Sequence, residues 1–176
     1  MLTRGSSHGF TMIEILIAVA IVALVLSLGV PSFMVYIQNT KVRNAADAVL
    51  NGMQLARSEA IRRNKRVEFQ LTSAMKSGWN VRQVNPSVDI QSRTSQEGSD
   101  TVTLDTTPGG ATTLTFDPMG GRVDNTDGSF SLDSVAFLST TGADTRKLQV
   151  QITPSGTVRM CDATPDLSNK DPRKCN

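Results

Sequence analysis

The chain has 176 residues, which gives room for one globular domain beside a long helix but hardly for two domains. Its 18 basic and 16 acidic residues nearly balance, so the net charge of +2 indicates no strong overall attraction to nucleic acid. The single histidine, His8, lies in a short polar leader, and a chain without that leader has no imidazole. This excludes Ser-His-Asp and Cys-His nucleophilic sites and histidine-based zinc sites, so we expect no enzymatic activity, no cofactor and no metal site.

A long apolar run follows the leader. Residues 10–30 carry one charged side chain, Glu14, and are numerous enough to span a bilayer as a helix. A carboxylate in such a helix costs about 3 kcal/mol, so it usually marks a function in which a partner offsets that cost. Small side chains along the run would let another helix approach closely: Ala18, Ala20, Ala23, Ser27 and Gly29.

The leader, residues 1–9, ends in Gly9 directly before the apolar run. An ordinary secretory signal is cut after its apolar region, at a site with small residues, and no such site follows Val30. A cut between Gly9 and Phe10 would instead leave the apolar helix in the mature protein. A generic signal anchor is the alternative, but it gives no reason for the carboxylate.

The segment GFTMIEILIAVAIVALVLSLGVPSF, residues 9–33, resembles the N-terminus of type IV prepilins and of the related type II secretion pseudopilins. In that family a prepilin peptidase cuts after the glycine and methylates the new N-terminal Phe. The resemblance assigns these roles to Gly9 and Phe10, a role in filament assembly to Glu14, and the family's helix-bending proline to Pro31. It implies a single-pass protein of the bacterial inner membrane, with a periplasmic C-terminal domain, that later joins a filament at the cell surface.

This resemblance suggests a partner for the carboxylate. In a filament, Glu14 of one subunit would meet the protonated N-terminal amine of Phe10 on a neighbouring subunit. Opposite charges in a low-dielectric bundle attract strongly, and the pairing would offset the cost of burial.

Residues 31–66 continue the helix as an amphipathic segment. Pro31 lacks a hydrogen-bond donor and should bend the helix rather than end it. The basic run 62–66 should close the helix, where cations complement its dipole, and we prefer this interpretation to a nucleic-acid patch. Glu59 and Arg63 are spaced for an ion pair. Apolar residues at three- and four-residue spacing predict a face on a core: Val42, Ala45, Ala46, Val49, Met53, Ala56 and Ala60.

Beyond Arg66 the apolar residues alternate, which predicts a β domain over residues 67–176. Residues 85–100 are polar and weakly patterned, and we expect a mobile loop there. Residues 124–128 lack the ligand spacing of a calcium loop and predict a tight turn, while Trp79 is expected in the core. The expected strands are 67–71, 79–84, 102–104, 114–116, 135–138, 148–152 and 158–160.

Four further segments, 53–64, 78–79, 116–120 and 154–161, resemble the GspH/FimT branch of minor pilins and pseudopilins. The resemblance implies an α+β fold in which a long N-terminal helix, transmembrane in its first half, packs on a small antiparallel β domain. It implies a minor type IV pilin that enters the pilus or primes its assembly, with other major and minor pilins, prepilin peptidase and the assembly platform as partners. A minor pseudopilin of a type II secretion system is the alternative.

The two cysteines, Cys161 and Cys175, lie near the C-terminus. An N-terminal export segment would place this end of the chain in an oxidising compartment, where a disulfide can form. We therefore predict a disulfide-closed tail, with two separate thiols as the alternative.

A role in DNA uptake is the alternative from another class of function. FimT-like minor pilins of naturally competent bacteria bind DNA through a C-terminal Gly-Arg-x-Arg element, and residues 156–159 here read Gly-Thr-Val-Arg. Thr157 replaces the first arginine, although phosphate binding needs several cations. Arg159, with Arg173 and Lys174, would form a smaller patch. We prefer a hairpin with one exposed arginine.

Overall fold

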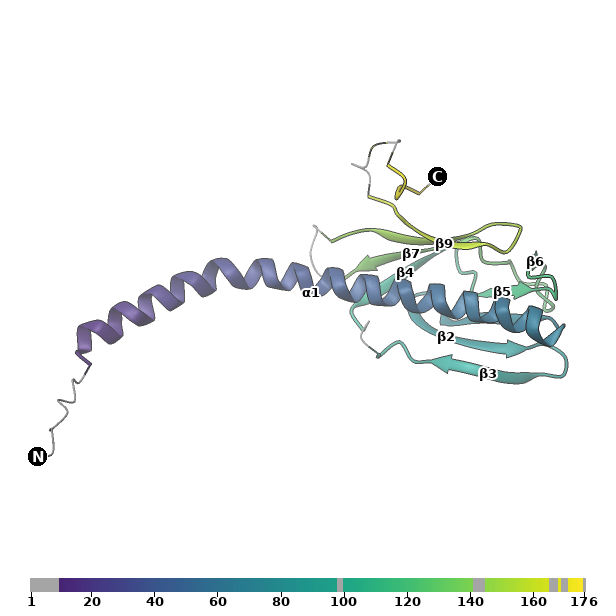
Figure 1. Cartoon of the computed structure of the whole chain (residues 1–176), viewed down its shortest axis with the longest axis horizontal. Coiled ribbons are helices and arrows are strands. Elements are labelled where there is room, and N and C mark those ends of the chain that lie inside the picture. The colour runs from purple at the N-terminus through teal and green to yellow at the C-terminus, as the bar shows by residue number, and fades with distance from the viewer. Residues whose placement is uncertain (1–9, 98–99, 141–144, 165–167, 169–170, 176) are drawn as a thin grey trace, which may run out of the picture. The chain divides into compact units, whose positions relative to one another are not determined.

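The computed structural model describes residues 10–97, 100–140, 145–164, 168 and 171–175, and these form one α-helix and nine β-strands (Figure 1). Contacts within the chain define two compact units, residues 1–36 and 37–176. The helix, α1, spans Met12–Arg63 and contributes to both units. The two units are therefore described in turn.

In the first unit, α1 is apolar and uncovered by other protein. Every described side chain from residue 12 to residue 30 is exposed. By its length and composition, α1 is able to cross a membrane. The helix also continues through Pro31, as predicted, so this proline does not end it.

The second unit contains two sheets, and all pairings between their strands are antiparallel. The first sheet has the order β3-β2-β1-β5-β6, formed by β1 (Val67–Ser73), β2 (Lys76–Gln83), β3 (Val88–Arg93), β5 (Thr113–Phe116) and β6 (Arg122–Val123). The second has the order β4-β7-β8-β9, formed by β4 (Val102–Thr107), β7 (Ser134–Ser139), β8 (Leu148–Ile152) and β9 (Val158–Asp162). The α+β fold is thus confirmed.

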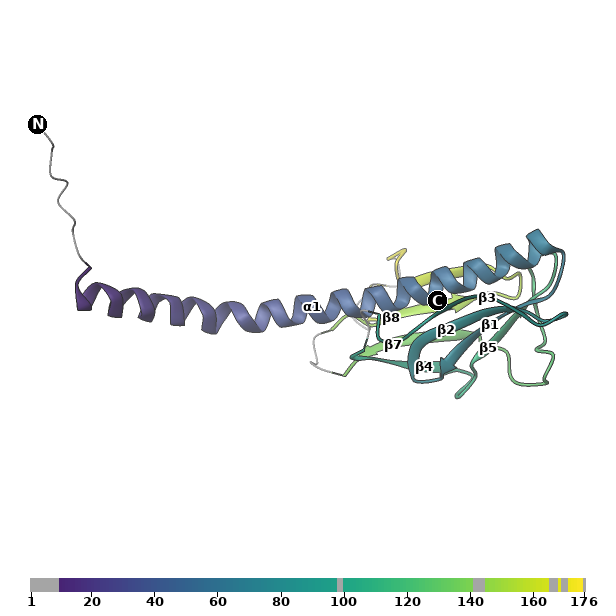
Figure 2. The same ribbon diagram turned by 90° about the horizontal axis from the view of Figure 1, so that it is seen from below.

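One hydrophobic core joins the two sheets to residues 37–63 of α1, which lie across them (Figure 2). All seven residues of the predicted helix face, from Val42 to Ala60, are fully buried there. From the sheets, Phe69, Phe116 and Phe137 fill the largest volumes. The predicted core position of Trp79 is also confirmed, since its side chain is 3% exposed.

The helix approaches the first sheet closely at Gly52. A Cβ atom at this position would lie 2.8 Å from Cε2 of Phe69 and 2.8 Å from Cε2 of Trp79, closer than real Cβ contacts. These two aromatic side chains lie on adjacent strands, with ring centroids 6.0 Å apart. Gly52 therefore sets how near α1 lies to β1 and β2.

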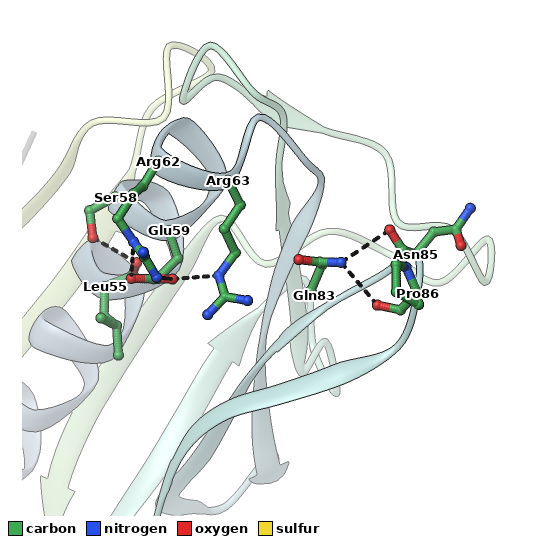
Figure 3. A network of polar contacts seen from close by, with 8 residues as sticks. All are labelled: Leu55, Ser58, Glu59, Arg62, Arg63, Gln83, Asn85 and Pro86. Carbon is green, nitrogen blue, oxygen red and sulfur yellow. Dashed lines mark hydrogen bonds and ion pairs between the residues drawn. The ribbon is translucent and has the colours of Figure 1, made fainter.

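The end of α1 confirms the predicted cationic cap. Glu59 pairs with Arg63 at 2.6 Å, as expected, and also with Arg62 at 2.6 Å (Figure 3). Hydrogen bonds from Arg62 and then Arg63 hold the pKa of Glu59 below its ordinary value. Asn64 follows with φ of 52°, and Lys65 donates its N–H to the Ala60 carbonyl, so the helix ends in a Schellman motif.

The prediction of a loop over residues 85–100 is wrong for Val88–Arg93, which form β3. This strand lies at the edge of the first sheet and is mostly exposed, so it lacks the alternating apolar residues that mark the inner strands. Backbone pairing with β2 holds it in place, helped by the Asn80 amide, which donates to Asp89 at 3.0 Å. Near the start of this segment, the Gln83 amide donates to the carbonyls of Asn85 and Pro86 (Figure 3).

The tight turn predicted for residues 124–128 is confirmed, since Gly128 donates its N–H to the Asn125 carbonyl. The side chain of Asn125 is 5% exposed and has a structural task. Its amide nitrogen donates to the Thr113 carbonyl at 3.2 Å, and its oxygen accepts from the Thr115 hydroxyl at 2.9 Å. The turn is therefore fastened to β5.

Replacing Gly52 by Val should destabilise the second unit by about 1–3 kcal/mol, because the added side chain forces Phe69 and Trp79 apart. Urea unfolding of the full chain in detergent micelles, followed by Trp79 fluorescence, measures the change. Asn51→Val is the matched control. It adds the same side chain on the exposed face of the helix, and neither change lowers helix propensity, so an equal loss in both variants would contradict the close approach.

Candidate functional site

The N-terminal candidate site begins with Phe10, whose side chain is 80% exposed and which precedes the helix. The next residue, Thr11, caps α1, because its hydroxyl oxygen accepts a hydrogen bond from the Glu14 N–H at 3.3 Å. Glu14 lies in the first turn, where a carboxylate complements the positive end of the helix dipole. The helix dipole thus gives one reason why a carboxylate is favourable at position 14.

Phe10 and Glu14 share a shallow groove with Ile15, Ala18 and Val19. Three of these residues are four positions apart, so they lie on one side of the first helical turns. The groove consists of apolar walls around one carboxylate. A cationic group from outside the chain can reach this carboxylate, since the residues around it are exposed. Gly9 lies outside the described residues.

The residue that the sequence reasoning missed here is Thr11. Its signal was present, since Thr11-Met12-Ile13-Glu14 is the S/T-x-x-E pattern of a capping box. The cap places Phe10 just outside the helix, so the peptide bond that precedes Phe10 is not part of the helical hydrogen-bond ladder. The processing and assembly roles of Gly9, Phe10 and Glu14 stay predictions.

The small residues along the apolar run are exposed, as helix packing requires. Ser27 is the one among them with a polar side chain, and its hydroxyl donates to the Leu24 carbonyl at 2.8 Å. Gly29 has no heavy atom within 4 Å of the position that a Cβ would occupy. Pro31 lies within α1, and its role in assembly stays a prediction.

At the other end of the chain, the predicted disulfide is confirmed. Cys161 on β9 is bonded to Cys175, and their Cα atoms are 5.0 Å apart. Two backbone hydrogen bonds reinforce the link: Asp162 donates its N–H to the Arg173 carbonyl at 2.6 Å, and Cys175 donates to the Asp162 carbonyl at 3.1 Å. The tail is thereby docked beside the end of β9.

The basic residues of the predicted DNA patch lie along this docked tail. Arg159 is exposed on β9, and its guanidinium donates to the Gln151 side chain at 2.9 Å. Arg173 pairs with Asp171 at 2.7 Å, and hydrogen bonds from Arg173 lower the pKa of that carboxyl to about 2. Lys174 is half-buried, and its backbone forms an isolated β-bridge with Asp162. The disulfide brings the tail to β9, but the charge of Arg173 is already neutralised, and DNA binding stays a prediction.

Gly156, the first residue of the DNA-motif position, has a clear structural task. Its φ of +76° requires glycine, and a Cβ there would overlap the carbonyl oxygen of Gly120. The same carbonyl accepts a hydrogen bond from Arg57 Nε at 2.9 Å. Gly156 therefore lets the β8–β9 hairpin pack against residues 117–121 and, through them, against α1.

Among the residues that the structure describes, no group of histidine, cysteine, aspartate and glutamate side chains is placed to hold a metal ion. The described polar groups outside the two ends of the chain are mostly engaged within the sheets. Glu68, for example, is 2% exposed and bonds to Arg82 and Thr126.

A long N-terminal helix on antiparallel sheets, with an exposed Phe and a Glu at its apolar start, defines a type IV pilin-like protein. The chain belongs to the GspH family: residues 45–156, more than half of its length, match the family model described as type II transport protein GspH. Residues 4–30 match the prokaryotic N-terminal methylation motif. No curated protein matches the sequence.

Two crystal structures of the type IV minor pilin FimU from Pseudomonas aeruginosa strain PAO1 are similar to this chain. The first has a TM-score of 0.54 and 16% identity, over 71% of this chain and 91% of the FimU chain. The second, from another crystal form, has a TM-score of 0.49 and 18% identity, over 67% of this chain and 90% of the other. The first likeness supports a shared fold.

The Asp171–Arg173 pair predicts a titration that can be measured at one residue. Because the pKa of Asp171 is lowered from 3.8 to about 2, the stabilisation is present above pH 4 and is lost as the pH falls through 2. In a ¹³C NMR titration of the side-chain carboxyl, Arg173→Gln should return the pKa toward 3.8. Arg159→Gln is the control and should leave the pKa near 2; an equal rise in both variants would contradict the pairing.

Proposed function

We propose that this chain is a minor type IV pilin, made as a single-pass precursor of the inner membrane and incorporated into a pilus or used to prime its assembly. The match of residues 4–30 to the N-terminal methylation motif carries the proposal. The uncovered apolar half of α1 supports it, since such a surface needs lipid or other helices around it. The fold shared with a protein described as a minor pilin is consistent with this role.

In this proposal, residues 1–9 are a leader that prepilin peptidase removes by cutting between Gly9 and Phe10. The Thr11 cap supports the cut, because it leaves Phe10 outside the helix. The same enzyme then methylates the new amine of Phe10. Residues 10–30 become the membrane helix and later the filament core, residues 31–66 continue the helix, and residues 67–176 form the exposed β domain with its disulfide-linked tail.

Assembly then depends on a charge pair between neighbouring subunits. The cut creates a protonated amine at Phe10, at the mouth of the groove that holds Glu14. Pairing between the amine of one subunit and the carboxylate of the next would offset the cost of keeping either charge in an apolar environment. Once neighbouring helices pack around the groove and exclude water, its apolar walls would strengthen this attraction. The assembly platform and the other major and minor pilins are the partners, and the role is structural rather than catalytic.

A minor pseudopilin of a type II secretion system is the second candidate function. The GspH family match favours it, because that family is described as type II transport protein. The same helix, groove and β domain serve both machines, so the two functions differ in the filament that contains the chain. Deletion of the gene separates them: loss of surface pili with normal secretion indicates the pilus, and retained pili with loss of protein secretion indicates the pseudopilus.

Gly9→Val should block processing, because the peptidase must accommodate the residue before the scissile bond. The unprocessed precursor should accumulate and migrate more slowly than the mature protein on a gel. Gly29→Val is the matched control, since a side chain at that position meets nothing within the chain. If Gly9→Val is processed as fast as Gly29→Val, the proposed cut is wrong.

Glu14→Gln should be processed normally but should enter filaments at least tenfold less, because the amide cannot form an ion pair with the neighbouring amine. Immunoblots of sheared filaments and of membranes measure the partition between the two pools. Asp105→Asn, which removes an exposed carboxylate from β4, is the control. Wild-type amounts of Glu14→Gln in filaments would show that assembly does not depend on this charge.

A further inference from the structure

The basic run at the end of α1 divides into two pairs. Arg62 and Arg63 both contact the carboxylate of Glu59, so this carboxylate offsets part of their charge within the helix (Figure 3). Lys65 and Arg66 follow the helix, are exposed, and contact no carboxylate among the described residues. The helix dipole supplies about half a negative charge at this end, so most of the charge of these two residues is unmatched.

Lys65 and Arg66 line a surface pocket of about 430 Å³ in the second unit. Clefts of about 300–1,000 Å³ are typical of small-molecule sites, so the pocket is large enough for a ligand of that kind. The rest of its lining comes from the helix end, the segment after β2 and the turns on either side of β6: Asn64, Val84, Asn85, Pro118 and Thr126.

Two primary amides add uncharged donors to this lining. The side chains of Asn64 and Asn85 are exposed, and neither makes a hydrogen bond within the part of the chain that the structure describes. The amide of Gln83 binds the backbone carbonyls of Asn85 and Pro86, which leaves the Asn85 side chain unengaged (Figure 3). The pocket therefore combines two cations with two available amides.

Among the described residues, no carboxylate lines the pocket. The carboxylates of three residues on neighbouring elements are held by other groups: Glu68 by Arg82, Asp117 by the N–H of Gly121, and Asp127 by the N–H of Ser129. A cleft lined by charges of one sign raises the local concentration of the opposite ion. The pocket therefore favours an anion.

Backbone contacts fix the segments that carry these donors before any ligand binds. The Val84 N–H donates to the Arg66 carbonyl at 3.0 Å, and the Gln83 amide donates to the Asn85 carbonyl at 3.2 Å. Only the ends of the side chains must then be ordered on binding, which lowers its entropic cost.

The number and charge of the donors favour a phosphate group over a carboxylate. A guanidinium such as that of Arg66 can bind two phosphate oxygens at once, and the Lys65 ammonium can bind another. The amides of Asn64 and Asn85 exceed what the two oxygens of a carboxylate would need. A phosphate monoester also carries a charge of about −1.5 to −2 at pH 7, which matches the two cations.

We propose that this pocket binds the phosphate group of a small molecule. Arg66 and Lys65 are the charged donors, and Asn64 and Asn85 are the neutral ones. The inference does not depend on the cut at Gly9, because the four donors all lie in the second unit. It adds a ligand site to the chain, whichever filament contains it.

The test uses the full chain in detergent micelles at constant ionic strength, with inorganic phosphate and adenosine 5′-monophosphate as probes. The side-chain amide peaks of Asn64 and Asn85 in ¹H–¹⁵N NMR spectra should shift and saturate with at least one probe. Tighter binding of inorganic phosphate identifies the free ion as the ligand, and tighter binding of the monoester identifies a phosphate on a larger molecule. Lys65→Gln and Arg66→Gln should each weaken the apparent affinity at least fivefold.

Arg62→Gln is the matched control, because it removes one positive charge from the same end of α1 but lies outside the pocket. It should leave the titration unchanged. Three results would overturn the proposal: no saturable shift with either probe, acetate binding as tightly as phosphate, or equal weakening by Arg62→Gln and Arg66→Gln. The last result would indicate a general attraction of anions to a positive surface. If one pocket variant does not fold, the other decides the test.

Discussion

The close approach of α1 to the two sheets is the contact on which the second unit depends. Its buried face is made mainly of alanine, with Gly52 at the point where no Cβ can fit over Phe69 and Trp79. Small side chains bring the helix backbone near the sheet, and the aromatic residues of the strands then fill the space around it. Overpacking at such a point cannot be relieved locally, since protein cores are packed as densely as organic crystals.

The same close packing sets the positions of the loops at the end of the domain. Gly120 and Gly156 both have positive φ; a Cβ at Gly156 would overlap the Gly120 carbonyl oxygen, whereas a Cβ at Gly120 would meet the Ile61 side chain of α1. Arg57 of α1 fixes the carbonyl between them. The glycine at the DNA-motif position therefore has a packing role that does not require nucleic acid. In the docked tail, Asp171 is paired with Arg173, so this arginine is not a free cation.

The helix face and most inner strands were predictable because burial imposes a period on the sequence. Val42, Val49 and Ala60 recur as a helix requires, and Val67, Phe69 and Leu71 alternate as a half-buried strand requires. β3 was missed because an edge strand is held by backbone pairing and leaves its side chains free to be polar. The fold class followed from pattern and resemblance together.

The residues of the candidate sites also differ in how far the sequence predicts them. The pairing of Cys161 with Cys175 was predictable because only two cysteines are present. The Thr11 cap had a recognisable four-residue signal that was overlooked. The surroundings of Trp79 had none, because they are built by Gly52 of α1 and Phe69 of β1, which are far from Trp79 in the chain.

The hydroxyl of Ser27 has a consequence for the proposed passage from membrane to filament. Its hydrogen bond is made within the helix, to the Leu24 carbonyl, and needs no partner outside the helix. Lipid chains and neighbouring apolar helices are then equivalent environments for this stretch, apart from the carboxylate at its start. In the proposed transfer from bilayer to filament, Ser27 therefore has no side-chain hydrogen bond to lipid to break, and Glu14 is the side chain of this run whose charge needs a new partner.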